Sequence, residues 1–268
     1  MSRILSQKEW EFTFHSFEAH DKLKQEQAEH IIQLISAVIK TDKDEVDRLI
    51  LEGAPLNLSL HGETTALGAA VENNDLLMVK HLILRGASVR HRFAGGMDAS
   101  WLAIKTKNEE IFQFLMDMGS QVNLKMTSTG ETKLITATQE TNYYAVSYLL
   151  NNKARVNDYD NTGRTALHYN LLKNPYTPED GAIGRLLLQL GGNPNIEDNQ
   201  GIPAGALAST DDQQALLEGY ALNNVSTAVM EKVKEITAPE NEEKIDFSNI
   251  TAPKITKPLP KPKGRKRL

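Results

Sequence analysis

Gly53-Ala54-Pro55-Leu56-Asn57 decides how this chain is interpreted, because a similar stretch returns along the sequence at a nearly constant interval. Its first position recurs at steps of 33, 33, 34 and 38 residues. A period of this size predicts stacked supersecondary units, each burying its apolar face against a neighbour, rather than one globular core. Such stacks present extended binding surfaces. The later copies begin at Gly86, Gly119, Lys153 and Gly191.

Each interval contains two short apolar segments with a polar break between them, which predicts two helices per unit. In the second unit, Thr65 is placed to cap a first helix that starts the apolar run Ala66–Val71. Asn73–Asp75 breaks that helix, and an apolar stripe between residues 77 and 83 predicts a second helix that Gly86 ends. We expect the other helix pairs at 29–39 and 45–51, 99–106 and 111–118, 132–139 and 143–151, and 165–172 and 183–190, with a sixth unit at 203–224.

The fifth unit carries the most specific motif, Gly163-Arg164-Thr165-Ala166-Leu167-His168, with Asp160 three residues before it. This motif resembles the Gly-x-Thr-Pro-Leu-His signature of the ankyrin repeat, whose leading aspartate Asp160 matches. The resemblance covers about residues 28–224. It implies an all-α ankyrin-repeat solenoid of about six helix-turn-helix units with short hairpin loops. It also implies a concave recognition face formed by the hairpin loops and first helices.

The chain departs from the repeat pattern at two places and is lengthened at a third. Unit three has Asp98-Ala99-Ser100-Trp101 where the signature is expected, and Lys153 takes a glycine position. A left-handed backbone at Lys153 costs about 1 kcal/mol, so Lys153→Gly is expected to raise the melting temperature. The extra length of unit five falls at residues 174–180. We expect a protruding loop there, followed by a second helix that starts early, at Thr177-Pro178.

Three regions are expected: a helical cap at 1–27, the repeats at 28–224, and a short helix followed by a disordered basic tail at 225–268. Trp10, Phe14 and Phe17 lie at i, i+4 and i+7 on one face of the first region. That face is interpreted either as a lid over the end of the stack or as a docking helix for a partner. From Thr237 the composition shifts to Pro, Glu, Lys and Asn, which is typical of disordered sequence.

The net charge of −5 conceals an acidic body and a basic tail. The last residues could act as a nuclear import signal, as an electrostatic contact to acidic surfaces, or only as a solubilising tail. We expect a cytoplasmic protein, with the nucleus or delivery into a host cell as alternatives. The acidic cluster Glu240–Glu243 supports the delivery alternative, because it looks like the tails of some bacterial type IV secretion effectors. The tail charges considered for targeting are Lys261, Lys263, Arg265, Lys266 and Arg267.

The sequence offers little for chemistry. It has no cysteine, and its seven histidines form no metal-binding pair. Asp158–Gly163 opens like a calcium loop, but Tyr169 stands where that loop requires a glutamate. We therefore predict a protein that is not an enzyme, with no catalytic residue, metal site or cofactor. The acidic repeats also disfavour nucleic-acid binding.

The predicted function is protein–protein interaction by a monomer, through the concave groove and the loop tips. Arg90-His91-Arg92-Phe93 forms a basic and aromatic cluster in one loop. Arginine and large aromatic residues dominate interface energetics. An alternative for Trp101 is that it fills a packing gap in a degenerate unit. Alternatives for the whole protein are a bacterial effector or a regulator targeted by its basic tail. The predicted partner-binding residues are Arg90, Arg92, Phe93, Trp101, Lys125, Met126, Tyr159 and Tyr169.

Overall fold

The computed structural model describes residues 22–59 and 64–221, and the regular structure of that part is helical. Isolated β-bridges close some of the loops, and none of the described residues forms a strand. The all-α prediction is therefore confirmed. The chain divides into two compact units, one containing residues up to Gln121 with Lys125–Ser128, and the other containing Val122–Leu124 with the residues from Thr129 onward.

The first unit contains three pairs of helices. They are α2 (Lys22–Ile39) with α3 (Lys43–Leu51), α4 (Ala66–Glu72) with α5 (Leu76–Leu84), and α6 (Ala99–Thr106) with α7 (Glu109–Asp117). The first helices α2, α4 and α6 contact one another in order, and each also contacts the second helix of its own pair. A 3-10 turn, η1 (Ala94–Gly96), lies in the loop before α6.

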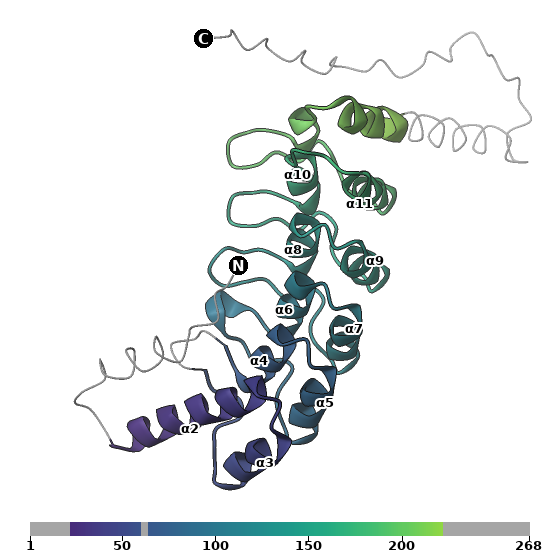
Figure 1. Cartoon of the computed structure of the whole chain (residues 1–268). Helices are drawn as coiled ribbons and strands as arrows, with labels where there is room; N and C mark the ends of the chain where they lie inside the picture. The colour runs from purple at the N-terminus through teal and green to yellow at the C-terminus, as the bar shows by residue number, and fades with distance from the viewer. Residues whose placement is uncertain (1–21, 60–63, 222–268) are drawn as a thin grey trace, which may run out of the picture. The chain divides into compact units, whose positions relative to one another are not determined.

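The second unit repeats this arrangement. Its pairs are α8 (Lys133–Gln139) with α9 (Tyr143–Asn151) and α10 (Ala166–Leu171) with α11 (Pro178–Gln189). In Figure 1, α8 and α10 stack in one layer and α9 and α11 in a second layer. Within each layer the two helices contact each other. The 3-10 turn η2 (Ala204–Leu207) packs on α10 where the pattern predicts a first helix, and residues 211–221 form the helix that follows it.

Short polar side chains start the helices where the sequence predicts starts. Asp75 accepts a hydrogen bond from the backbone N–H of Met78, and Asn142 accepts one from Ala145, each satisfying a donor that a helix start leaves unpaired. At α11, Thr177 and Asp180 form a capping box around Pro178 at the first turn. The predicted early start of this helix is confirmed.

Small residues let the first helices pack closely. Residues 66–71 of α4 are all buried, including three alanines and Gly68. A Cβ atom built on Gly68 would lie 3.2 Å from a Leu102 methyl carbon of α6, which shows how near the two helices approach. The apolar side of each second helix closes the core, as Leu82 and Leu149 do with no exposed surface. Small residues of α4 and large apolar residues of the second helices therefore share the core.

Three expectations of detail have different outcomes. Lys153 has a φ of 65°, so the left-handed conformation predicted there is confirmed. The inserted loop does not simply protrude, because Tyr176 folds back and its hydroxyl lies 3.0 Å from Asn170 Oδ1. Helix α2 spans Lys22–Ile39 without a break, so the boundary predicted between the cap and the repeats, after residue 27, falls inside a helix. The aromatic face at Trp10, Phe14 and Phe17 and the tail at 225–268 lie outside the described residues.

Candidate functional site

One buried carboxylate shapes each hairpin loop of the second unit. Asp160 Oδ1 accepts hydrogen bonds from the backbone N–H groups of Thr162, at 2.8 Å, and Arg164, at 3.1 Å. Asp198 repeats the pattern with the N–H groups of Gln200 and Ile202, at 2.9 and 3.2 Å. Each aspartate thereby folds the chain back on itself, and a β-bridge closes the base of each loop. These loops are called the Asp hairpins below, and they comprise residues 158–165 and 196–203.

Tyr169 of α10 also points at the first Asp hairpin. Its hydroxyl donates to Asp160 Oδ2 over 2.5 Å. Burial, together with this bond to a carboxylate, raises the pKa of Tyr169 to about 12. Burial opposes ionisation of Asp160, but its hydrogen bonds outweigh burial and lower the pKa of this carboxyl. Tyr169 is therefore a half-buried support of the hairpin, and only part of its surface is open to a partner.

The Asp hairpins are tied to their neighbours by backbone hydrogen bonds. Asn161 N donates to Thr129 O, and Asn199 N donates to Thr162 O, both at 2.9 Å. Asn199 Nδ2 adds a bond of 2.9 Å to Asn161 O. The tips are thus held in a fixed row with outward-pointing side chains. Tyr159 stands out among them because 57% of this aromatic residue is exposed.

The predicted basic and aromatic loop of the first unit is built differently. Phe93 is only 5% exposed, and its ring lies against α4, where a Cβ atom on Gly68 would be 3.3 Å from Phe93 Cζ. Arg92 is exposed, but its guanidinium donates to Gly96 O at 3.0 Å and to Lys125 O at 2.6 Å. We expected these residues to reach a partner. The structure instead uses Phe93 as core and Arg92 as a clasp between two loops.

Two further residues predicted to contact a partner are buried and therefore cannot reach one. Trp101 has no exposed surface and lies in the core of the first unit, so the packing alternative holds for it. Met126 is 8% exposed. Lys125 is half-buried, and its carbonyl oxygen is the group that Arg92 engages. Sequence alone did not reveal these outcomes, because the chain gives residue types but not the direction in which a loop side chain points.

Arg90 performs a task that asparagine performs elsewhere. Asn157 Nδ2 donates to Gly191 O, and Asn157 Oδ1 accepts from Asn193 N, both at 2.9 Å, so one side chain joins two consecutive turns. Asn57 and Asn123 make the same pair of bonds. Arg90 stands at the equivalent position and donates from Nε to Gly119 O at 2.9 Å. Its exposed side chain therefore connects two turns within the first unit.

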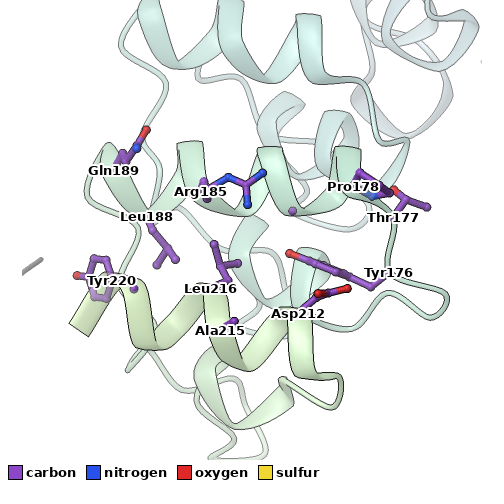
Figure 2. Close-up of a pocket in the computed structure, with 12 residues that line it drawn as sticks. Tyr176, Thr177, Pro178, Arg185, Leu188, Gln189, Asp212, Ala215, Leu216 and Tyr220 are labelled. Carbon is purple, nitrogen blue, oxygen red and sulfur yellow. The ribbon is translucent and has the colours of Figure 1, made fainter. Parts of the chain in front are cut away.

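A groove that the sequence did not indicate lies between α11 and residues 211–221, and Figure 2 shows its lining side chains. Its volume is about 700 Å³. Leu188 belongs to the apolar core of the last repeat, and Leu216 and Tyr220 pack against that core while remaining partly exposed. Arg185 reaches into the middle of the groove, and Asp212 lies beside Tyr176 at one end. We call this feature the α11 groove.

A buried polar network fixes the Tyr176 end of the α11 groove. Asp180 is nearly inaccessible and accepts from Thr177 Oγ1 at 2.7 Å and from Lys173 Nζ at 3.0 Å. Burial opposes ionisation of Asp180, yet these bonds outweigh it and lower the pKa of its carboxyl. Burial and the nearby carboxylate of Asp180 raise the pKa of Tyr176 to about 12. The inserted residues of unit five therefore build a rigid wall of the groove.

Metal binding and membrane insertion have no support among the described residues. Among residues 22–59 and 64–221, no cluster of three or more histidine and acidic side chains is arranged to hold a metal ion. Within those same ranges, no helix has the length and apolarity needed to cross a bilayer. The proposed targeting residues Lys261, Lys263, Arg265, Lys266 and Arg267 lie outside the described residues.

The repeated helix pairs and hairpin loops define a helical repeat protein, and the comparisons name the repeat. Residues 34–126 match the family model described as ankyrin repeats, in three copies. The fold is similar to that of EF0377, described as an ankyrin repeat protein (TM-score 0.58, 23% identity, 71% of this chain and 94% of that chain). It is also similar to an ankyrin repeat domain from Acinetobacter baumannii AYE (TM-score 0.62, 24% identity, 70% of this chain and 97% of that chain). Residues 34–126 are therefore ankyrin repeats, and the described part of the chain has the fold of an ankyrin-repeat solenoid.

Ankyrin repeats are generally protein–protein interaction modules, and their fold typically serves as a non-enzymatic scaffold. The expected class of function agrees with this. The likeness to the two solved structures concerns the fold, so the partner has to be argued from the surface of this chain.

Proposed function

We propose that this protein is a binding module without catalytic activity, and that its second unit recognises a protein through the tips of the Asp hairpins. The observation that carries the proposal is Tyr159, an exposed aromatic side chain on a loop whose backbone is fixed by Asp160 and by bonds to its neighbours. A rigid aromatic anchor loses little conformational entropy on binding, and tyrosine is enriched among residues that dominate interfaces.

Polar groups around Tyr159 complete a surface of the kind that proteins recognise. Asn161, Glu197 and Asn199 are exposed on the same two hairpins and can form the hydrogen-bonding rim of an interface. Tyr169 adds a half-buried surface behind the tips. Of the predicted contact residues, Tyr159 is the one in the second unit that is mainly exposed.

The test compares two exposed tyrosines of the same unit. A partner captured with the intact chain is identified, purified and titrated against variants. Tyr159→Ala is expected to weaken binding at least tenfold, about 1.4 kcal/mol. Tyr143 lies on the outer helix α9 and is similarly exposed at 47%, so Tyr143→Ala is the matched control and is expected to leave affinity unchanged. Equal affinities for the two variants, or a larger loss with Tyr143→Ala, would remove the hairpin tips from the interface.

A further inference from the structure

The two Asp hairpins stack on one another through a single asparagine. Asn199 donates from its backbone N to Thr162 O and from Nδ2 to Asn161 O, both over 2.9 Å. The same residue packs on Gly163, where an added Cβ atom would lie 2.6 Å from Asn199 Oδ1. Two successive carbonyl groups and a glycine of one hairpin therefore receive one asparagine of the next.

The loop before the first Asp hairpin receives an asparagine in a similar way. Asn161 N donates to Thr129 O at 2.9 Å. A Cβ atom built on Gly130 would lie 2.9 Å from Asn161 N. Gly130 has a φ of 72° and Gly163 one of 80°, so the two receiving glycines also share a backbone conformation. The second unit thus contains a docking geometry for asparagine that is used twice.

The last Asp hairpin presents the same receiving groups at the end of the row. Gly201 has a φ of 73°, and a Cβ atom built on it would meet no atom within 4 Å. Asn199 O and Gln200 O hold the places that Asn161 O and Thr162 O hold in the preceding hairpin. Among the residues that the structure describes, no donor bonds to either oxygen, and all three residues are exposed. We call Asn199 O, Gln200 O and Gly201 the open edge.

The open edge already has the conformation that receives an asparagine elsewhere. Asp198 Oδ1 accepts from Gln200 N at 2.9 Å and from Ile202 N at 3.2 Å, and Gly201 N donates to Asp198 O at 2.8 Å. Little ordering of this hairpin is therefore needed on binding, which favours affinity. Unpaired peptide groups held in a row are a template for pairing with another chain.

We propose that the open edge binds a loop of a partner protein that presents an asparagine. The backbone N–H of this asparagine donates to Gln200 O and its side-chain amide to Asn199 O, as Asn199 itself does to the preceding hairpin. Asparagine suits the site because it adds a side-chain donor, whereas aspartate offers only acceptors. The inference deepens the proposed function, on which its role in recognition rests.

A peptide that copies the asparagine donor tests the open edge. A backbone-cyclised peptide containing residues 196–203 is titrated into the isotopically labelled full-length protein and followed by NMR. A bond to a carbonyl oxygen polarises the whole peptide group, so the amide signals of Gln200 and Gly201 are expected to shift. The amides of Thr162 and Gly163 follow carbonyl groups that are already bonded and should stay unchanged.

Two substitutions sharpen the test. A peptide with alanine in place of Asn199 lacks the side-chain donor and is expected to bind at least about fivefold more weakly. In the protein, Gly201→Ala places a methyl group where the asparagine would pack and should weaken the unchanged peptide by at least about fivefold. Gly191→Ala is the matched control, because Gly191 also has a positive φ and open space around it. It should leave peptide binding unchanged, and melting temperatures show whether both protein variants fold.

Several results would overturn the proposal. Unchanged Gln200 and Gly201 signals at millimolar peptide would mean that the open edge does not bind such a loop or is covered by another part of the chain. Equal binding of the alanine peptide would remove the asparagine from the contact. Shifts that depend on protein concentration alone would identify a second copy as the occupant. Failure of the proposed function is distinguishable, because Tyr159→Ala is tested on the captured partner and should leave binding of the peptide unchanged.

Discussion

The hairpin loops of the two units share one equivalent buried position, which holds an apolar side chain in the first unit and a carboxylate in the second. The position lies three residues after Arg90, Asn123, Asn157 and Asn195, which are the matching residues of four successive turns. It is occupied by Phe93 and Met126 in the first unit, and by Asp160 and Asp198 in the second. Their exposed fractions are 5%, 8%, 4% and 5%. The first unit fills this position with apolar packing and the second with a hydrogen-bonded carboxylate. The comparison shows that the repeat requires a buried anchor at this position, while the type of anchor can change.

The two solutions leave different surfaces. In the second unit the carboxylate fixes the loop from within, so Tyr159 and Glu197 next to it remain exposed. In the first unit Arg92 must hold the loop from outside through Gly96 O and Lys125 O. Its guanidinium is thereby occupied by the protein itself. This difference is why we assign recognition to the Asp hairpins.

The largest expected effect is on the apolar anchor. Phe93→Ala removes a buried ring that packs on α4, and large-to-small changes of this kind cost about 3–5 kcal/mol. Urea unfolding followed by circular dichroism measures the loss. Arg92→Ala, which breaks two bonds at an exposed residue, should cost less, about 1–2 kcal/mol. The order of the two variants is the informative result, and a smaller loss for Phe93→Ala would contradict its assignment to the core.

The polar anchor should be nearly as important. Asp160→Ala leaves the N–H groups of Thr162 and Arg164 and the hydroxyl of Tyr169 without their acceptor, at a cost of about 2–4 kcal/mol. The neighbouring Asp158→Ala is the control and should change the free energy of unfolding by less than about 0.5 kcal/mol. Equal effects of both variants in urea unfolding would show that the carboxylate does not hold the hairpin.

The anchors should also differ in their response to acid. Burial opposes ionisation of Asp160 and Asp198, but hydrogen bonds lower the pKa of each below the ordinary 3.8. Because the folded-state pKa is the lower one, their contribution is present above the unfolded pKa and is lost as the pH falls below about 4. For His168, by contrast, burial itself lowers the pKa below 6.5, so stability also begins to decline as the pH falls below about 6.5.

NMR titration separates the anchors. The amide protons of Thr162 and Arg164 should shift as Asp160 is protonated, whereas the amide of Phe93, which donates to Met97 O, should not. An equal acid shift in both loops would mean that the observed change is global unfolding rather than loss of one anchor.

The smallest expected effect is at the turn before the first Asp hairpin. Lys153 has a positive φ, as Gly53, Gly86, Gly119 and Gly191 have at the matching positions. Lys153→Gly relieves about 1 kcal/mol of strain and should raise the melting temperature by about 2–4 °C. The control is Asn152→Gly. Asn152 precedes Lys153 in the same turn and has a negative φ, so this change should not stabilise the protein. A lower melting temperature for Lys153→Gly would show that the lysine side chain contributes more than the strain costs.

The periodic features of the sequence predicted the fold. The direction in which individual loop side chains point could not be predicted from it. Caps such as Thr177, the left-handed residue at Lys153 and the helix pairs follow from local chemistry, and the structure confirms them. Phe93 and Trp101 were predicted as contacts because of their residue type, but both are buried, and for Phe93 the covering neighbour is α4, which is distant in the sequence. The α11 groove could not be foreseen either, since it depends on how the inserted Tyr176 folds back.

Hydrogen exchange of the free and partner-bound protein tests the central claim most directly. The account predicts that binding slows exchange of amide groups in residues 158–165 and 196–203, which form the Asp hairpins, while α9 and α11 keep the exchange rates of the free protein. Slower exchange confined to α9 and α11, with unchanged hairpins, would contradict the assignment of recognition to the hairpin tips.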